Sequence, residues 1–216
     1  MTKVGIIGAT GMAGSAAFKE AQIAGLDVTA IVRNATKAKK ELGDSIQILE
    51  KDAFSLTKDD LSGFDVIVDA FSTDPAKAYL HVDLTAKLIS LFREEKQPRF
   101  IFILGAGSLR TGADHHLVVE DIKKAPGSKA WIGTPINQLS ELHFLQDVTN
   151  VDWVGISPGA SFVPGTAASN ILVGSNELLA DKEGKSETTA GTMAKVIVKE
   201  IEEPSHKQER FTVANG

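Results

Sequence analysis

From residue 4 to residue 14 the chain reads Val4-Gly5-Ile6-Ile7-Gly8-Ala9-Thr10-Gly11-Met12-Ala13-Gly14, and this stretch decides the fold. A short hydrophobic run is followed at once by glycines at every third position and then by a helical pattern. Glycine allows a sharp turn from strand to helix, a close approach of the main chain to a bound group, and tight packing of the helix on the sheet. The stretch therefore predicts a strand, a tight turn and a helix in direct succession.

The glycine turn has the features of a diphosphate-binding loop. Free N–H groups and the positive dipole end at a helix N-terminus favour an anion, so we expect the pyrophosphate of a dinucleotide to lie across this turn. The residues assigned to the contact are Gly8, Thr10, Gly11, Met12 and Gly14. A nucleoside triphosphate loop would end in Gly-Lys-Ser or Gly-Lys-Thr, and no Lys follows here. A turn that merely joins a strand to a helix is the alternative.

The rest of the chain alternates between short hydrophobic runs and helical patterns, which is typical of a parallel sheet with right-handed crossovers. The runs that we expect to form strands are 3–8, 27–32, 46–49, 66–70, 100–104, 151–156 and 211–213. The expected helices run from about 11 to 24, from 75 to about 95, from 133 to 146 and from about 189 to 202. The predicted fold class is therefore α/β, a Rossmann-type doubly wound, mainly parallel sheet in a single NAD(P)-binding domain of residues 1–216.

Three finer expectations follow from the same patterns. The first helix should turn Met12, Ala16 and Ile23 toward the core. The region from residue 106 to 133 mixes Gly, His, Lys and Pro and gives no clear assignment. The segment from about residue 157 to 185 is rich in Gly, Ser and Ala, and we expect it to line a cleft.

Composition and charge exclude several function classes. A formal net charge of -5 disfavours nucleic acid as a partner, because neutralising phosphates needs clustered Lys and Arg. The absence of cysteine excludes disulfides and Cys-ligated zinc. No signal-peptide pattern and no window of about 20 apolar residues is present, so we expect a cytoplasmic protein without membrane contact. His115-His116 beside Asp114 predicts no metal site, because adjacent side chains point apart. The oligomeric state stays open.

The end of the second expected strand indicates which nucleotide is bound. An acidic residue there would bond the ribose 2′-hydroxyl of NAD, or the ribose hydroxyls in an S-adenosylmethionine site, but the sequence has Val32-Arg33-Asn34. A guanidinium pairs with a 2′-phosphate through two hydrogen bonds, so Arg33 favours NADP(H) over NAD(H), unless it is a solvated surface residue. Asp52, followed by Ala53, could accept a hydrogen bond from the adenine amino group or could cap a loop.

Several segments together resemble a known family. They are Gly8 to Gly14, Val32-Arg33-Asn34, Lys51-Asp52, Val68-Asp69-Ala70-Phe71, Gly105-Ala106-Gly107-Ser108-Leu109, Ile156-Ser157-Pro158-Gly159-Ala160 and Arg210-Phe211-Thr212-Val213-Ala214. Over nearly its whole length the chain is similar to the atypical short-chain dehydrogenase/reductase group of NADH-flavin reductases, related to NmrA-like and biliverdin-reductase-B-like proteins. The resemblance implies an NADP-binding Rossmann domain. It places Ala70, Phe71 and Ser72 beside the adenosine ribose and the turn of Gly105, Ala106 and Ser108 near the nicotinamide ribose.

One difference from ordinary short-chain dehydrogenases limits the reactions that the protein is expected to catalyse. Ordinary members use a Tyr-x-x-x-Lys pair, in which Lys lowers the pKa of the Tyr that exchanges a proton with substrate. The only tyrosine is Tyr79, and Asp83 stands where the Lys would be. Sugar epimerisation is therefore disfavoured. Flavin reduction remains compatible, because its proton can come from solvent while stacking and positioning do most of the work.

The candidate walls of an acceptor site are Phe71, Trp131, Phe162 and the Pro158-Gly159 turn, and we also assign Pro158 and Gly159 to the cofactor contact. The candidate catalytic residues are Ser108, His115, His116 and Asn137. Two function hypotheses follow. The first is an NAD(P)H-dependent oxidoreductase acting on flavin, quinone or a similar small conjugated acceptor without a Tyr-Lys pair. The second is a non-catalytic NADP(H)-binding redox sensor.

Overall fold

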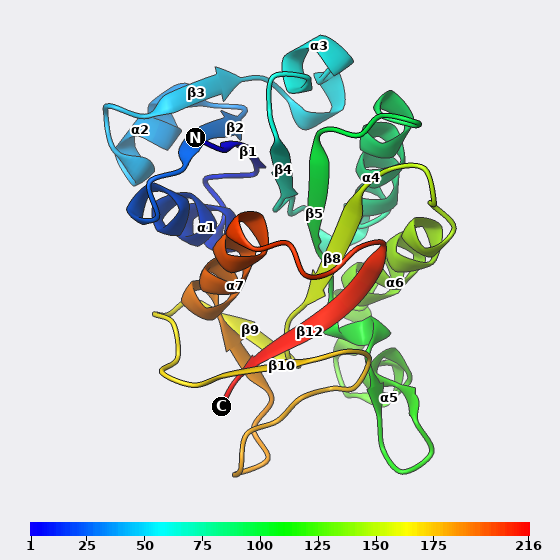
Figure 1. The fold of residues 1–216 in the computed structure, drawn as a ribbon. Coiled ribbons are helices and arrows are strands. Elements are labelled where there is room, and N and C mark those ends of the chain that lie inside the picture. The colour runs from blue at the N-terminus through cyan, green and yellow to red at the C-terminus, as the bar shows by residue number, and fades with distance from the viewer.

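The computed structural model describes all 216 residues and shows one large sheet with helices on both faces (Figure 1). The strands are β1 (Lys3–Ile7), β2 (Asp27–Val32), β3 (Gln47–Glu50), β4 (Val66–Asp69), β5 (Arg99–Ile103), β6 (Arg110–Thr111), β7 (His116–Leu117), β8 (Trp153–Ser157), β9 (Ser161–Val163), β10 (Ile171–Gly174), β11 (Glu187–Thr189) and β12 (Glu209–Asn215). The α-helices are α1 (Met12–Ile23), α2 (Ala35–Leu42), α3 (Lys58–Leu61), α4 (Leu80–Leu91), α5 (Val118–Lys124), α6 (Gly133–Gln146) and α7 (Ala190–Glu202). Short 3-10 turns are η1 (Ala53–Ser55), η2 (Pro75–Lys77), η3 (Ala106–Ser108) and η4 (Ser128–Ala130).

The eight strands of the large sheet lie in the order β10-β12-β8-β5-β4-β1-β2-β3. All neighbours are parallel except β10 and β12, which are antiparallel. β1 lies between β2 and β4, so the chain reverses its direction of winding beside β1. This is the strand order of a Rossmann-type doubly wound sheet, and the predicted single-domain α/β fold is confirmed.

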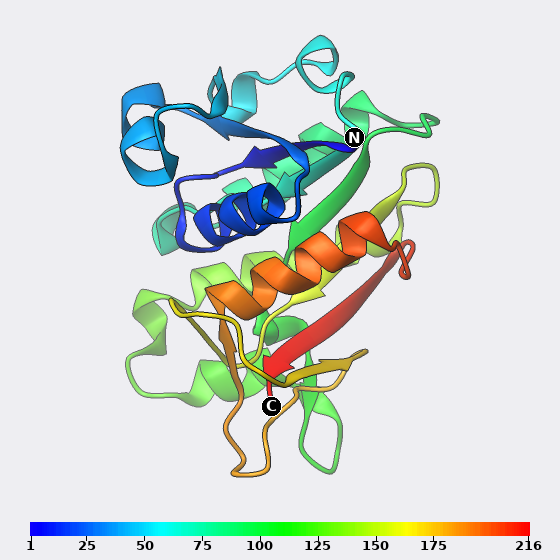
Figure 2. The same ribbon diagram turned by 60° about the vertical axis from the view of Figure 1, so that its left-hand side comes forward.

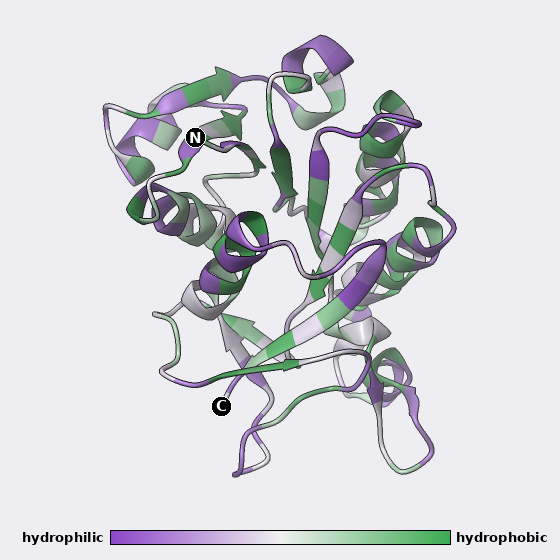
Figure 3. Cartoon of the chain, in the orientation of Figure 1, coloured by the Kyte–Doolittle hydropathy of each residue, from purple (hydrophilic) through white to green (hydrophobic).

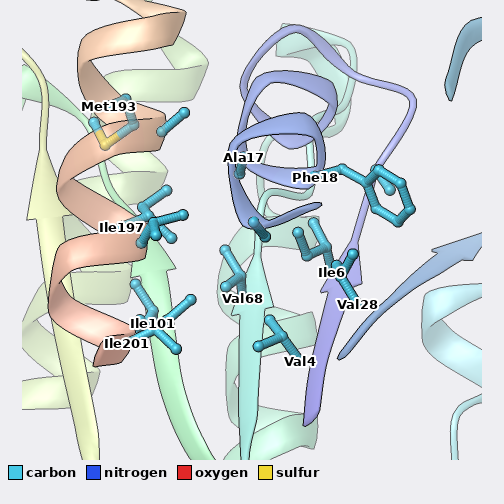
Figure 4. Close-up of a cluster of buried hydrophobic side chains, with 14 of the residues drawn as sticks. Val4, Ile6, Ala17, Phe18, Val28, Val68, Ile101, Met193, Ile197 and Ile201 are labelled. Carbon is cyan, nitrogen blue, oxygen red and sulfur yellow. The ribbon is translucent and has the colours of Figure 1, made fainter. Parts of the chain in front are cut away.

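Two hydrophobic cores lie on opposite faces of the sheet, because successive strand residues point to opposite sides. In β5, Ile101 joins the core under α1 and α7, whereas Phe100 and Phe102 join the core under α4 and α6. α1 and α7 lie side by side (Figure 2). Figure 3 shows mostly hydrophobic central strands beneath helices of alternating character. Figure 4 shows Met193 and Ile197 of α7 on the same side of the sheet as α1.

The expected inward face of the first helix was wrong in two of its three residues. Met12 is 38% exposed and Ile23 is 80% exposed, while Ala16 packs partly against the core. The buried residues of α1 are Gly14, Ala17, Phe18 and Ala21. Their spacing is that of one helical face, and this face meets both the sheet and α7. Met12 lies outside that stripe and faces a cavity described below.

Other boundaries also differ from the sequence-based expectations. The helix expected from 75 to 95 is the single turn η2 followed by the shorter α4, which ends at Leu91. The unassigned region 106–133 contains η3, the β6–β7 hairpin, α5 and η4. Within the segment 157–185, β10 forms the outer antiparallel strand of the sheet. None of the helices is both long enough and apolar enough to cross a bilayer.

A buried ion pair joins α7 to the start of β5. The Arg99 guanidinium donates to the Glu200 carboxylate at 2.7 Å, and both side chains are buried. The backbone N–H groups of Ser205 and His206 donate to the same carboxylate at 3.0 Å. Burial alone would raise the pKa of Glu200, but the hydrogen bonds from Arg99 and His206 outweigh it and lower the pKa to about 2. The pair thereby fixes the connection that leads into β12.

Replacing Glu200 by Gln leaves Arg99 buried without a full counter-charge, so we expect Glu200→Gln to lower the free energy of unfolding by about 3 kcal/mol at pH 7. Folding lowers the pKa of Glu200, so its contribution is present above the ordinary value of 4.5 and is lost as the pH falls toward 2. Urea unfolding at several pH values should show the difference from wild type shrinking in acid. Glu202→Gln, at an exposed position of α7, should change stability by less than about 0.5 kcal/mol. A difference independent of pH would contradict this account.

Candidate cofactor-binding and active site

A crevice lies at the carboxyl ends of the parallel strands, beside β1 and β4. In doubly wound sheets ligands bind at this edge, where the chain leaves neighbouring strands toward opposite faces. Two adjoining cavities occupy the crevice and share five wall residues, Gly11, Ala70, Phe71, Ser72 and Thr73. Their volumes are about 610 and 500 Å³, within the range of small-molecule sites.

The glycine turn after β1 is shaped by close backbone contacts. Gly8 has φ +75°, a left-handed conformation that favours glycine. A Cβ on Gly8 would lie 2.6 Å from the carbonyl oxygen of Ala70, and a Cβ on Gly14 would overlap the carbonyl oxygen of Gly8. Gly11 donates a hydrogen bond to Gly8 O at 2.8 Å and closes the turn. The turn is therefore a cradle that side chains at positions 8 and 14 would fill.

The N-terminus of α1 opens into this cradle without a partner from the chain itself. Gly11 is its N-cap residue and provides no side-chain hydrogen bond, and the first turn carries no acidic residue. The N–H groups of the first helical turn have no intrahelical acceptor. Free N–H groups and an uncompensated dipole are what an anion requires. The residues present therefore fit the diphosphate of a dinucleotide.

The cradle gives a direct test of the local packing. We expect Gly14→Ala to destabilise the protein by about 1–3 kcal/mol, because the new Cβ meets backbone that cannot move aside. Alanine normally favours a helix over glycine by about 1 kcal/mol, so a loss can only come from the contact. Chemical denaturation measures the change. Gly63→Ala is the control, since nothing lies within 4 Å of its added Cβ. Equal stability of Gly14→Ala and wild type would refute the packing argument.

The first cavity has a cationic rim. Its wall residues are Ile7, Gly8, Thr10, Gly11, Ile31, Val32, Arg33, Lys37, Lys51, Asp52, Ala53, Phe54, Ala70, Phe71, Ser72, Thr73, Asp74, Lys77 and Leu80. Lys51 is paired with Asp60 at 2.6 Å, and Lys37 lies 3.7 Å from Glu41. Arg33 is exposed and pairs with no carboxylate. Asp52 accepts a hydrogen bond from the N–H of Phe54 at 2.9 Å, so it caps η1 while also facing the cavity.

The second cavity is more apolar. Its wall residues are Gly11, Met12, Ala13, Ala70, Phe71, Ser72, Thr73, His81, Ile103, Leu104, Gly105, Ala106, Gly107, Ile122, Trp131, Thr134, Pro135, Gln138, Pro158, Gly159, Ala160 and Phe162. The three aromatic residues expected from the sequence, Phe71, Trp131 and Phe162, are among them. His81 is the only titratable side chain in this wall. A flat apolar molecule with a few polar atoms fits such a site.

The structure brings the predicted cofactor-binding residues together but not the four catalytic candidates. The Ser108 hydroxyl is buried and donates to Gly105 O at 3.1 Å. Asn137 donates to Gly133 O at 2.8 Å. His115 and His116 lie by the β6–β7 hairpin, where His116 bonds Asp114 at 2.6 Å and Asp121 at 2.7 Å. None of the four lines either cavity, and a catalytic role for them stays a prediction. Tyr79 is 53% exposed and also lies outside both walls.

Sequence reasoning missed the polar residues that α4 and α6 contribute. Gln138 lies four residues after Thr134 on the same face of α6 and reaches the wall beside Gly105. His81, on α4, packs its ring edge-on against Phe71 at a centroid distance of 5.4 Å. The spacing of Thr134 and Gln138 was a usable signal. Nothing local to position 81 indicated that α4 would turn it into the crevice.

A buried acidic pair lies behind the second cavity. Glu141 on α6 accepts a hydrogen bond from the Thr85 hydroxyl on α4 at 2.6 Å, and both residues are buried. Burial raises the pKa of Glu141 to about 8. The hydrogen bond from Thr85 lowers this pKa and the Asp69 charge raises it, but both effects are smaller than that of burial. Burial raises the pKa of Asp69 to about 6, although the Phe71 N–H bonded to it acts in the opposite direction. Burial lowers the pKa of His81. At neutral pH Glu141 is therefore mostly protonated, and burial favours the neutral form of His81.

Known proteins match this chain over nearly its whole length. A sequence profile described as NAD(P)H-binding matches residues 8–204. YwnB of Bacillus subtilis (strain 168), an uncharacterised protein, is 37% identical over 99% of this chain and 98% of its own length. A crystal structure from Lactobacillus casei is 36% identical, covers 100% of both chains and superposes with a TM-score of 0.92. A proposed NADH-flavin reductase from Streptococcus pneumoniae TIGR4 is 30% identical, with 100% coverage of both chains and a TM-score of 0.89.

Proposed function

The chain belongs to the NAD(P)H-binding family, and from this premise we propose that it is an NAD(P)H-dependent reductase of flat conjugated acceptors such as flavins or quinones. The single observation that carries the proposal is the second cavity. It is an apolar space with Phe71, Trp131 and Phe162 in its walls, and it adjoins the glycine cradle directly. The Streptococcus pneumoniae relative, proposed to be an NADH-flavin reductase, supports the same reaction class.

The division of the crevice matches the two ends of the cofactor. The α1 N-terminus would hold the diphosphate, the cationic first cavity the adenosine end, and the second cavity the nicotinamide. Bound there, NAD(P)H supplies a hydride to an acceptor stacked beside it. The protein contributes apolar walls that exclude water, and the amide of Gln138 and hydroxyl of Thr134 offer hydrogen bonds to the polar edge of the acceptor.

The acceptor is reduced without a Tyr-Lys pair. Tyr79 lines neither cavity, and α6 carries no Tyr or Lys. A flavin or quinone does not require a phenol as its proton donor, because the anion formed by hydride transfer can take its proton from another group. Positioning of the two rings therefore supplies most of the rate enhancement.

The reductase is tested by mixing purified protein with NADPH or NADH and a panel of FMN, FAD and quinones. Expected is a loss of reduced-nicotinamide absorbance that depends on enzyme and acceptor. Filling the acceptor space with Ala160→Trp should raise KM for the acceptor more than it raises the Kd of the nucleotide, since Ala160 lines only the second cavity and the proposed diphosphate and adenosine contacts lie elsewhere. Tight binding of oxidised and reduced nucleotide with no turnover of any acceptor would favour a redox sensor instead.

We further propose a preference for NADP(H), carried by Arg33. The guanidinium lies on the rim of the first cavity, is exposed, and is not engaged by a carboxylate, so it can take the 2′-phosphate in a bidentate contact. Lys37 stands on the same rim and adds positive potential.

Arg33→Asp should weaken NADPH binding about 10- to 100-fold, because a hydrogen-bonded charge contributes about 1.5–3 kcal/mol. NADH binding should change little or improve, since an Asp accepts a bond from the 2′-hydroxyl. Isothermal titration with both nucleotides measures the ratio. Arg93→Asp introduces the same change at an exposed position away from both cavities and should leave the ratio unaltered. An unchanged ratio in Arg33→Asp would remove Arg33 from the site.

A further inference from the structure

His81 occupies a special position in the second cavity. It is the only titratable side chain in the wall, is 7% exposed, and none of its ring nitrogens is hydrogen-bonded to protein. Phe71 holds the ring edge-on from the crevice side. An imidazole that is free of partners and faces a ligand space is able to exchange a proton with what binds there.

A buried carboxyl group is hydrogen-bonded to the helix that carries His81. Thr85 follows His81 by four residues on α4, so both side chains lie on one helix face about one turn apart. The Thr85 hydroxyl is hydrogen-bonded to Oε1 of Glu141 at 2.6 Å. The other oxygen, Oε2, is buried and has no partner. Glu141 thus reaches from α6 to the face of α4 that carries His81.

The surroundings of Glu141 keep it uncharged at neutral pH. β4 contributes the Asp69 carboxylate, which disfavours a second negative charge nearby. α4 contributes Thr85 and the neutral His81, while Lys77 of η2 is exposed and η3 carries no titratable side chain. No cation therefore compensates an ionised Glu141 in its buried place.

We propose that Glu141 is the proton reserve of the acceptor site and that His81 is the group that delivers the proton to the acceptor. The inference rests on the proposed reductase function. The acceptor takes a hydride from the reduced nicotinamide and forms one new bond to hydrogen. One ring nitrogen of His81 then gives its proton to the resulting anion, and the other takes the Glu141 proton through the Thr85 hydroxyl or one water molecule. After product release a proton from solvent returns to the cavity-facing nitrogen of His81, and the other nitrogen gives its proton back to Glu141 by the same route, so the sum is acceptor, NAD(P)H and H⁺ giving reduced acceptor and NAD(P)⁺.

Packing alone does not explain an ionisable group at position 141. A glutamine has nearly the same shape and would keep a hydrogen bond with Thr85. Burying a carboxyl with an unpartnered oxygen carries a free-energy penalty that an apolar residue would reduce. What glutamine cannot do is give up a proton. The proton is therefore the property that distinguishes Glu141 from its neutral equivalent.

The first test needs neither cofactor nor turnover. Infrared spectra of the protein should contain the carbonyl band of a protonated carboxyl at pH 7, absent from Glu141→Gln and titrating near pH 8. Glu202→Gln, at an exposed carboxylate, should keep the band. Folding raises the pKa of Glu141 from 4.5 to about 8, so wild-type stability should fall relative to Glu141→Gln as the pH rises through this interval. An ionised Glu141 at pH 7 would overturn the proposal whatever the activity.

The second test is the pH profile of acceptor reduction. Wild-type kcat should be level at neutral pH and fall above about pH 8, as the reserve loses its proton. Glu141→Gln and His81→Gln should each lower kcat on the order of 10²-fold and lose this break, with the KM of the acceptor and the Kd of the nucleotide little changed. His143→Gln, on the exposed face of α6, should behave as wild type.

The outcomes separate the two proposals. A purely structural Glu141 predicts that Glu141→Gln keeps the wild-type kcat and pH profile, and this result would overturn the proton reserve while leaving the reductase intact. If wild type reduces no acceptor in the panel, the reductase proposal fails and the proton reserve fails with it. If Glu141→Gln and His81→Gln both lose the fall of kcat above about pH 8, and wild type shows the infrared band, the reductase and the proton reserve are both supported.

Discussion

The nucleotide end of the molecule depends on one close backbone contact, the approach of Gly14 to the carbonyl of Gly8. Because neither residue has a Cβ, α1 begins directly over the end of β1 and its free N–H groups open into the crevice. The left-handed backbone of Gly8 also brings the turn against Ala70, which follows β4. This single turn thus sets both the direction of α1 and its distance from Ala70, on the other side of the crevice. The proposed contacts with the cofactor all depend on the position that this turn gives to α1.

The sheet order gives the two cavities their different character. Parallel strands deliver their carboxyl ends to one edge, so segments far apart in the chain meet there. β2 and β3 lead into Arg33, Lys37 and Lys51, which make one half of the crevice cationic. β5 and β8 lead into small and apolar residues, among them Gly105 and Pro158. A dinucleotide has the same asymmetry, with phosphates toward the adenosine end and an uncharged reduced ring at the other.

The sequence was informative where structure is local and failed where it depends on helix packing. The strand, glycine turn and helix at residues 3–23 follow from adjacent residues, and Arg33 follows from the rule that strand ends reach the crevice. The inward face of α1 was misjudged because the stripe that contains Ala17 is chosen by α7, which is distant in sequence. His81 and Glu141 looked like ordinary helix residues. Only the docking of α4 on α6 puts one in the cavity wall and buries the other behind it.

The two buried acids, Asp69 and Glu141, differ in whether a structural role accounts for them. Asp69 ends β4 and accepts the N–H of Phe71 at 2.9 Å, so it shapes the turn that forms the shared wall of both cavities. That structural role accounts for an acid at position 69. Glu141 makes one hydrogen bond that a neutral side chain could make, and its second oxygen is unpartnered. Burial is the main cause of the raised pKa of Glu141, and the Asp69 charge acts in the same direction. The residue that shapes the wall of the crevice therefore also disfavours ionisation of Glu141.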